Sequence, residues 1–411
     1  ASWTDRENDA MTYYVLIAFC VIILLAYIFD VTAKHTKIPG VILLILTGMA
    51  INYLADFLKI SIPNMSGLLP VMGTLGLILI VLEGSLDLTV SRDKGRLIIG
   101  SVSSAILLFA VFTGIFTYIA VNFLHYDLQA AVINIIPLAV ISSAVAIPSA
   151  AGLQPADREF VTYESSLSDI VGILIFDFIL LSSGSLASGA LRFVAELVLT
   201  LLASILFSAG LALLLHKISH HVKYVIIMTA IILVYAMAKL IHLPSLLVVL
   251  IFGLVMNNNV LLQNRFSRQI INFEEFNAEL SSFKNIVAEL TFVIRCFFFI
   301  LFGFYTSVAD LLNLNNLLFS VSITAAIFIL RALYFKIVLR APLNPLVYFA
   351  PRGLITILLF LSIPSAMLLP FMNVGVVTQV IFLTILMMTF GNMIFRRAAP
   401  GPQNKQEQES L

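Results

Sequence analysis

Long apolar stretches separated by short polar segments follow one another along the 411-residue chain. A transmembrane helix needs about 20 predominantly apolar residues, and by this measure the pattern predicts about 13 spans. Their ranges are 13–29, 39–58, 66–90, 96–123, 128–152, 158–183, 190–216, 222–242, 244–258, 284–306, 316–340, 346–369 and 374–395. We therefore expect an all-α polytopic membrane protein. The boundary between the eighth and ninth spans depends on Pro244 alone.

The amino-acid composition also indicates a membrane protein. Hydrophobic residues make up 61% of the sequence, charged residues 11%, and the mean hydropathy is +1.07. These values exclude a water-soluble domain of this length. The two cysteines, Cys20 and Cys296, provide neither a metal-ligand spacing nor a disulfide framework. We expect the lipid bilayer as the surroundings and no nucleic-acid partner.

Positive charges alternate between the two sets of loops, which allows an orientation to be assigned. One set contains Lys34, Lys37, Arg92, Lys94, Arg96, Arg158, Lys217, Lys223, Arg265, Arg268, Lys284, Lys336, Arg340, Arg396, Arg397 and Lys405. The other contains only Arg6, Lys59, Arg192 and Lys239. The richer set is expected in the cytoplasm, which places the amino terminus outside and the carboxyl terminus inside.

The chain is expected to form a single transmembrane domain over residues 1–411. Within it, residues 261–283 alternate aromatic and charged side chains, which predicts an amphipathic linker on the cytoplasmic side. Residues 399–411 are polar and are expected to be disordered.

Two carboxylates and three hydroxyls lie within six consecutive residues of the sixth predicted span. They belong to the run Glu164-Ser165-Ser166-Leu167-Ser168-Asp169. A turn of about 100° per residue places Glu164, Ser165, Ser168 and Asp169 within an arc of about 140°. Carboxylates at bilayer depth cost several kcal/mol unless they are paired, solvated or neutralised, and they mark ion or proton pathways. Asp169 is the leading candidate for the transport site.

Two spans contain signs of broken helices at matching positions. In the fifth, Pro137 and Pro148 bracket the pair Ser142 and Ser143, and the twelfth contains Pro351-Arg352-Gly353. Irregular backbone in a membrane lines a cavity or is buried in protein. Breaks at corresponding places predict inverted repeats, spans 1–6 and 8–13, with a transport site at the midplane. Kinked helices that serve packing alone are the alternative.

Four motifs together resemble one family. They are Leu82-Glu83-Gly84, the run from Glu164 to Asp169, Ile329-Leu330-Arg331-Ala332 and Pro351-Arg352-Gly353-Leu354. In this order they resemble the monovalent cation/proton antiporters, in particular the NhaP-type and animal sodium/proton exchangers. The resemblance covers the whole membrane domain. It implies a homodimer in the plasma membrane, with a dimerisation domain and a core domain that contains two crossed, unwound helices (spans 5 and 12) and moves like an elevator. It also implies that Asp169 is the ion carrier.

The sequence departs from that family at two positions. The residue before the carrier carboxylate is usually Asn or Asp, and here it is Ser168. Where the exchangers have Thr-Asp-Pro, this chain has Ser142-Ser143-Ala144, which is similar to the Ser-Ser pair of Kef-type potassium efflux systems. Fewer anionic ligands favour the more weakly hydrated potassium ion, but both sodium and potassium stay open.

One carboxylate cannot hold a proton and a cation at once, so competition at Asp169 is expected to produce exchange. Desolvation favours the protonated form of a carboxyl group and brings the two ligands into competition near neutral pH. With no second carboxylate adjacent, we expect electroneutral one-for-one antiport and no cofactor beyond the transported ions. A cation-coupled symporter and a cation channel are the alternatives. An enzyme is not expected, because the usual hydrolase and phosphate-loop motifs are absent from the sequence.

The other polar residues of the spans are assigned to an ion pair, to cation binding or to accessory roles. The resemblance pairs Glu164 with Arg331 as a structural ion pair. Hydroxyls of Ser165, Ser168, Ser142 and Ser143 are candidate cation ligands, although serines in membrane helices often bond to their own backbone instead. The accessory set is completed by Glu83 and Asp87 at a funnel entrance or in interfacial ion pairs, by Arg295 in an ion pair with these acids, and by Arg352 in a structural role.

Overall fold

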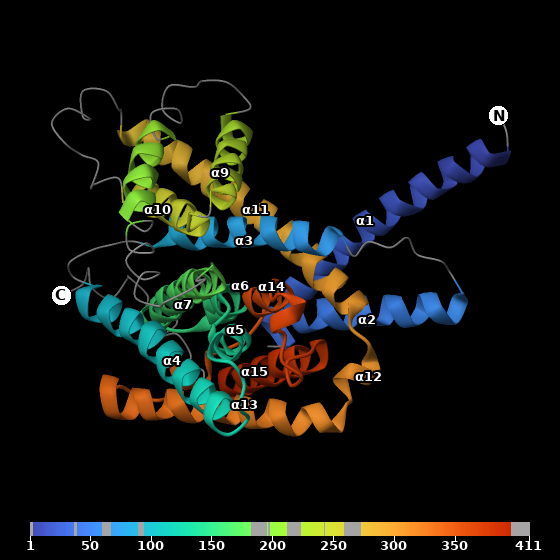
Figure 1. The fold of residues 1–411 in the computed structure, drawn as a ribbon. Coiled ribbons are helices and arrows are strands. Elements are labelled where there is room, and N and C mark those ends of the chain that lie inside the picture. The colour runs from blue at the N-terminus through green and yellow to red at the C-terminus, as the bar shows by residue number, and fades with distance from the viewer. Residues whose placement is uncertain are drawn as a thin grey trace, which may run out of the picture.

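Helices form the whole of the regular structure in the computed structural model, which describes residues 3–36, 39–59, 67–88, 94–181, 195, 198–211, 223–241, 243–258 and 273–395 (Figure 1). The helices are α1 Trp3–Thr36, α2 Gly40–Leu58, α3 Leu68–Asp87, α4 Gly95–Asn122, α5 Leu128–Ala139, α6 Ser143–Ser149, α7 Pro155–Leu181, α9 Lys223–Leu240, α10 Ser245–Asn257, α11 Phe273–Tyr305, α12 Val308–Leu311, α13 Leu314–Tyr334, α14 Leu354–Leu361 and α15 Val374–Phe395. Residues 198–211 are also helical.

Within these ranges, eight helical stretches are long and apolar enough to cross a membrane. They are Gly40–Leu58, Leu68–Asp87, Gly95–Asn122, Leu128–Gly152, Lys223–Leu240, Glu275–Tyr305, Leu314–Leu339 and Val374–Ile394. Shorter apolar helices cover Leu16–Thr32, Val198–Leu211 and Ser245–Asn257. The helices fall where the sequence places spans, while the full count of 13, the repeats and the orientation stay predictions.

The predicted linker over residues 261–283 overlaps a transmembrane helix. Helix α11 begins at Phe273, so residues 273–283 are its first turns, and residues 261–272 lie outside the described part of the chain. Phe276, Leu280 and Phe283 are buried. Their spacing of four and three residues continues the buried face of the span, which explains why the helix extends across the charged segment. The predicted disordered tail, 399–411, also lies outside the described residues.

The helices pack as two groups that meet around α3. Helix α2 packs along α11, and α3 packs against both α10 and α11. In the second group α4 contacts α5, α7 and α13, and α13 packs along α15. Figure 1 shows α5, α6, α7, α14 and α15 together at the centre of the molecule, with α3 above them, α13 below them and α4 running diagonally at the lower left. This centre contains the candidate site.

Both helix breaks that the sequence predicts are present at the centre. Helix α5, with Pro137 inside it, ends at Ala139, and α6 begins at Ser143 after an extended connection. In the second half, residues 349–353 are non-helical and α14 begins at Leu354. The two breaks are joined directly, because the Ser142 amide donates a hydrogen bond to the Pro351 carbonyl, at 2.9 Å.

Two glycines permit a close crossing of α2 and α11. A Cβ atom on Gly48 would lie 2.1 Å from the Ile300 carbonyl oxygen, and a Cβ atom on Gly303 would lie 2.1 Å from that of Ile45. Small residues allow membrane helices to approach backbone to backbone. The pair therefore fixes α2 against α11.

We expect Gly48→Ala to lower the melting temperature of the purified protein in detergent. The added methyl group overlaps the α11 backbone, and overpacking of this kind costs about 1–3 kcal/mol. Gly210→Ala in the helix over residues 198–211 is the control, because nothing lies within 4 Å of its added Cβ and alanine is favoured in helices. Equal melting temperatures for the Gly48 variant and the wild type would contradict the close crossing.

Candidate functional site

Asp169 is fully buried in α7, opposite the break between α5 and α6. One of its carboxylate oxygens, Oδ2, accepts hydrogen bonds from the Ser143 amide at 3.2 Å and from the Ser143 hydroxyl. Ser143 is the first residue of α6, so the carboxylate faces the free N–H groups and the positive dipole end of a short helix. The break thus positions and partly compensates a charge in the apolar interior.

Two buried oxygens at the break have no hydrogen-bond partner among the described residues. They are Oδ1 of Asp169 and the hydroxyl oxygen of Ser142. Gly353 makes room for this hydroxyl, because a Cβ there would lie 2.7 Å from Ser142 Oγ and 2.9 Å from a Val145 methyl group. Buried polar atoms are normally satisfied, so an unpartnered carboxylate oxygen and hydroxyl are suitable ligands for a small cation.

The serines of α7 hold the helix and the break in place. Ser168 Oγ accepts a hydrogen bond from the Ile141 amide at 2.9 Å, which satisfies a backbone donor of the extended connection. The Ser165 hydroxyl donates to the Val161 carbonyl of its own helix, at 2.7 Å. Its only hydroxyl proton therefore has an acceptor within α7, as is common for membrane serines. The Ser166 hydroxyl faces Gly84 of α3, where an added Cβ would lie 3.0 Å away.

Arg352 binds the carbonyl groups that the two breaks release. Its guanidinium donates to the carbonyls of Leu138 at 2.8 Å, Ala139 at 3.1 Å and Ala350 at 2.9 Å. Its amide donates to the Thr384 hydroxyl at 3.0 Å. The side chain is 3% exposed. Arg352 thus links the two irregular segments. The negative ends of the carbonyl dipoles compensate the positive charge of its buried guanidinium.

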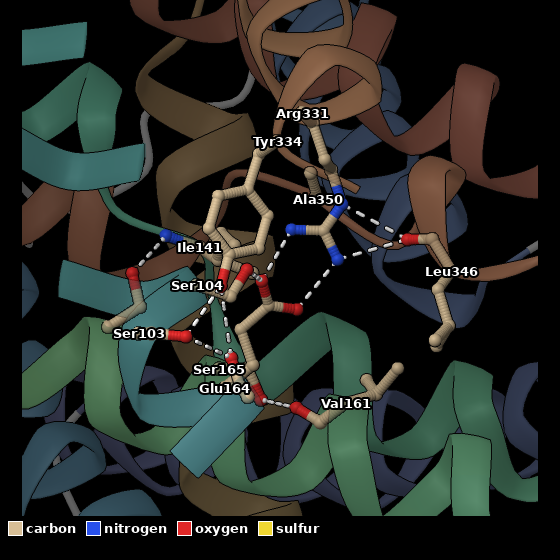
Figure 2. Close-up of polar contacts among 12 residues, drawn as sticks. Ser103, Ser104, Ile141, Val161, Glu164, Ser165, Arg331, Tyr334, Leu346 and Ala350 are labelled. Atoms are coloured by element: carbon tan, nitrogen blue, oxygen red, sulfur yellow. Dashed lines mark hydrogen bonds and ion pairs between the residues drawn. The ribbon is translucent and has the colours of Figure 1, made fainter. Parts of the chain in front are cut away.

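Glu164 and Arg331 form a fully buried ion pair, drawn in Figure 2. The two terminal guanidinium nitrogens, Nη1 and Nη2, lie 2.6 Å from Oε1 and Oε2 of Glu164, respectively. This is the bidentate geometry of the strongest charge-assisted hydrogen bonds. Arg331 also donates two hydrogen bonds of 3.0 Å to the Leu346 carbonyl. The pair therefore connects α7, α13 and the segment that precedes α14.

Sequence reasoning missed the hydroxyls of α4 that complete this ion pair. The Ser104 hydroxyl donates to Oε1 of Glu164. Next to it, Ser103 is hydrogen-bonded to the Tyr334 hydroxyl at 2.6 Å (Figure 2). The sequence did contain a signal for these polar contacts, because Ser101, Ser103 and Ser104 form a hydroxyl cluster inside an apolar span.

Two of the accessory residues, Glu83 and Asp87, have partners other than Asp169. Glu83 interacts electrostatically with Arg295. Asp87 is an exposed partner of Lys284, at 4.0 Å. The Arg295 guanidinium instead reaches α6, where Nη1 donates to the Ala144 carbonyl at 3.4 Å.

Arg295 also lines a cavity of about 390 Å³. Asp30 of α1 and Ala144 and Val145 of α6 are among its other lining residues. The cavity therefore reaches the turn of α6 that follows Ser143. Within the described residues no three His, Cys, Asp or Glu side chains gather into a metal site, and the break presents one carboxylate and neutral oxygens.

A buried carboxylate beside two broken helices, inside a bundle of apolar helices, defines an ion-coupled membrane transporter. The chain belongs to the sodium/hydrogen exchanger transmembrane family, whose model matches residues 20–396. It is thus an integral, multi-pass membrane protein of a transporter family, and the plasma membrane is the usual location of such proteins.

Two solved structures share the fold. Both are of the sodium proton antiporter MjNhaP1 from Methanocaldococcus jannaschii, one determined at pH 8 and one from an electron-microscopy map. The first is 18% identical with a TM-score of 0.67 and covers 93% of this chain and 96% of that one. The second is 20% identical with a TM-score of 0.66 and covers 92% and 95%. No curated protein matches the chain.

We expect Arg331→Ala to destabilise the protein by about 3–5 kcal/mol, the usual cost of leaving a buried carboxylate without its partner. The result should be a low yield of monodisperse protein and a lower melting temperature. Lys239→Ala is the matched control, because Lys239 pairs with Asp177 at 2.9 Å while its side chain is 52% exposed, and exposed pairs contribute about 0–1 kcal/mol. A well-folded Arg331→Ala protein with altered ion preference would contradict a structural role for the pair.

Proposed function

We propose that the chain exchanges a monovalent cation, Na⁺ or K⁺, for a proton, with both ligands competing for Asp169. The observation that carries this proposal is the unpartnered Oδ1 of a fully buried carboxylate whose other oxygen is fixed by Ser143. A membership in the sodium/hydrogen exchanger family supports the reaction class. Proton and cation each neutralise the carboxylate, and each loaded form crosses the low-dielectric interior at a lower cost than the bare anion.

The cation is expected to bind at the break between α5 and α6. Asp169 Oδ1 supplies the charge, and the Ser142 hydroxyl supplies a neutral oxygen that has no other partner. Ser143 and Ser168 keep lone pairs that can join the shell, whereas Ser165 is a weaker candidate because its hydroxyl is bonded to Val161. A single carboxylate with neutral oxygens is compatible with both Na⁺ and K⁺.

Alternating access is proposed to occur by movement of one helix group against the other, like an elevator. The mobile core would contain α4 to α7 and α13 to α15, in which Glu164–Arg331 and Arg352 join the broken helices into one unit. The other group would contain α2, α3, α10 and α11, with the crossing at Gly48 and Gly303 as a rigid support. In the proposed arrangement this second group forms the interface of a homodimer.

Cations are proposed to approach through the cavity that Arg295 and Asp30 line, since it ends beside the α6 turn that follows Ser143. In the orientation given by the loop charges this is the cytoplasmic side. Glu83 and Asp87, close to Arg295 and Lys284, would raise the local cation concentration there.

We expect Asp169→Asn to abolish cation-driven proton movement in proteoliposomes that contain a pH-sensitive dye. The amide can neither release a proton nor attract a cation, so both half-reactions are lost. Sodium, potassium and lithium gradients are tested in turn, and the ions that change the internal pH of wild-type vesicles identify the substrate.

The matched control for this experiment is Asp177→Asn, the same change on the same helix. Asp177 pairs with Lys239 near the end of α7, and its variant should keep most of the exchange activity. If wild-type vesicles respond to none of the three cations, antiport is wrong. If Asp169→Asn exchanges like the wild type, the carrier assignment is wrong.

Exchange is expected to be electroneutral, because the break offers one carboxylate for one cation or one proton. Rapid cation jumps applied to protein on a solid-supported membrane should therefore give no sustained transport current while the pH signal is large. Current that scales with exchange would show unequal stoichiometry. A conductance without proton movement would indicate a channel.

A further inference from the structure

A groove distinct from the ion site runs along α4 on the side of α5 and α7. Its volume is about 590 Å³, within the range of pockets that bind small molecules. Its α4 wall is a stripe with helical spacing: Ile106, Phe109, Ala110, Thr113, Thr117 and Val121. The opposite wall comes from Val132 of α5 and from Val171 and Ile175 of α7. Gly114 opens the middle, where an added Cβ would meet nothing within 4 Å.

Two hydroxyls in this apolar groove have no hydrogen-bond partner among the described residues, those of Thr113 and Thr117. Thr117 is 8% exposed. Other helical threonines of the chain, such as Thr291 and Thr306, bond to the carbonyl four residues earlier, at 2.7 and 2.8 Å. A buried hydroxyl without a hydrogen-bond acceptor is costly. The Thr117 hydroxyl therefore indicates a ligand that supplies an acceptor.

The groove is continuous with the lipid-facing surface of the helix bundle. Ile106, Tyr118 and Leu128 line the groove and are 45%, 62% and 50% exposed. Large apolar side chains exposed on a membrane protein contact acyl chains. Water is a poor occupant, because it needs two to four polar partners and the lining is largely apolar.

We propose that one acyl chain of a diacyl glycerophospholipid occupies this groove, with its ester carbonyl accepting a hydrogen bond from Thr117. The dimensions agree, because Ile106 lies about 16 Å from Thr117 along the helix axis, and one leaflet contributes about 15 Å of hydrocarbon. The headgroup then lies beyond Tyr118 and Asn122, where α4 ends.

The bound chain contacts the two helices that build the ion site. Val171 and Ile175 follow Asp169 on α7, and Val132 belongs to the half-helix that ends at the break. The lipid therefore fills the space between α4 and these helices and acts as a structural part of the core.

A photoreactive lipid tests this proposal independently of transport. The protein is reconstituted with phosphatidylethanolamine that has a diazirine in one acyl chain, illuminated, digested and mapped by mass spectrometry. We expect labelling of α4 between residues 106 and 121 and of α7 near Ile175. Gly114→Trp fills the groove and should remove this labelling. Ile115→Trp on the same helix is the control, because Ile115 is 42% exposed and does not line the groove.

The hydroxyl is tested separately with Thr117→Val and Thr117→Ser. The valine variant keeps the shape and should lower labelling about two- to tenfold, the range that a single hydrogen bond supplies, while the serine variant should restore it. Size-exclusion profiles establish that each variant is folded. Labelling of the groove that is equal in Gly114→Trp and wild type would overturn the proposal, as would wild-type protein labelled only elsewhere.

Discussion

Every backbone N–H and C=O group inside a membrane must find a partner within the protein, and this constraint governs the centre of the structure. Interrupting two helices releases several such groups at once. The Ser142 amide pairs with the Pro351 carbonyl, the Ile141 amide with Ser168, and three carbonyls with Arg352. The broken backbone is stable because each interruption supplies partners for the other. Only in this setting can Asp169 face the open end of α6.

The buried charges around the breaks are also compensated by partners within the protein. Four ionisable side chains are buried around the breaks: Asp169, Glu164, Arg331 and Arg352. Glu164 and Arg331 satisfy each other within the pair, so the electrostatic state of the centre changes with Asp169 alone. The carboxylate proposed to exchange ions thus lies in a framework whose other charges are paired or hydrogen-bonded.

The sequence predicted the parts of this centre that follow from local rules. Prolines located both helix breaks, and hydroxyls with a carboxylate on one helical face located Asp169. The partners of Arg352 were not predictable, because carbonyls occur at every residue and only the folded contact between segments more than 200 residues apart selects Leu138 and Ala139. Ser104 was missed for a related reason: a hydroxyl in an apolar span usually bonds to its own helix. The start of α11 at Phe273 was not predicted, because charged residues hid the buried stripe of Phe276, Leu280 and Phe283.

The hydrogen bond between Ser142 and Pro351 has a consequence for how the protein is made. These residues belong to opposite halves of the chain, and a ribosome delivers them to the membrane at different times. Until the second half has been inserted, the interrupted helix of the first half has released backbone groups and no Arg352 to bind them. The break that faces Asp169 therefore obtains all of its hydrogen-bond partners only after the second half has been inserted.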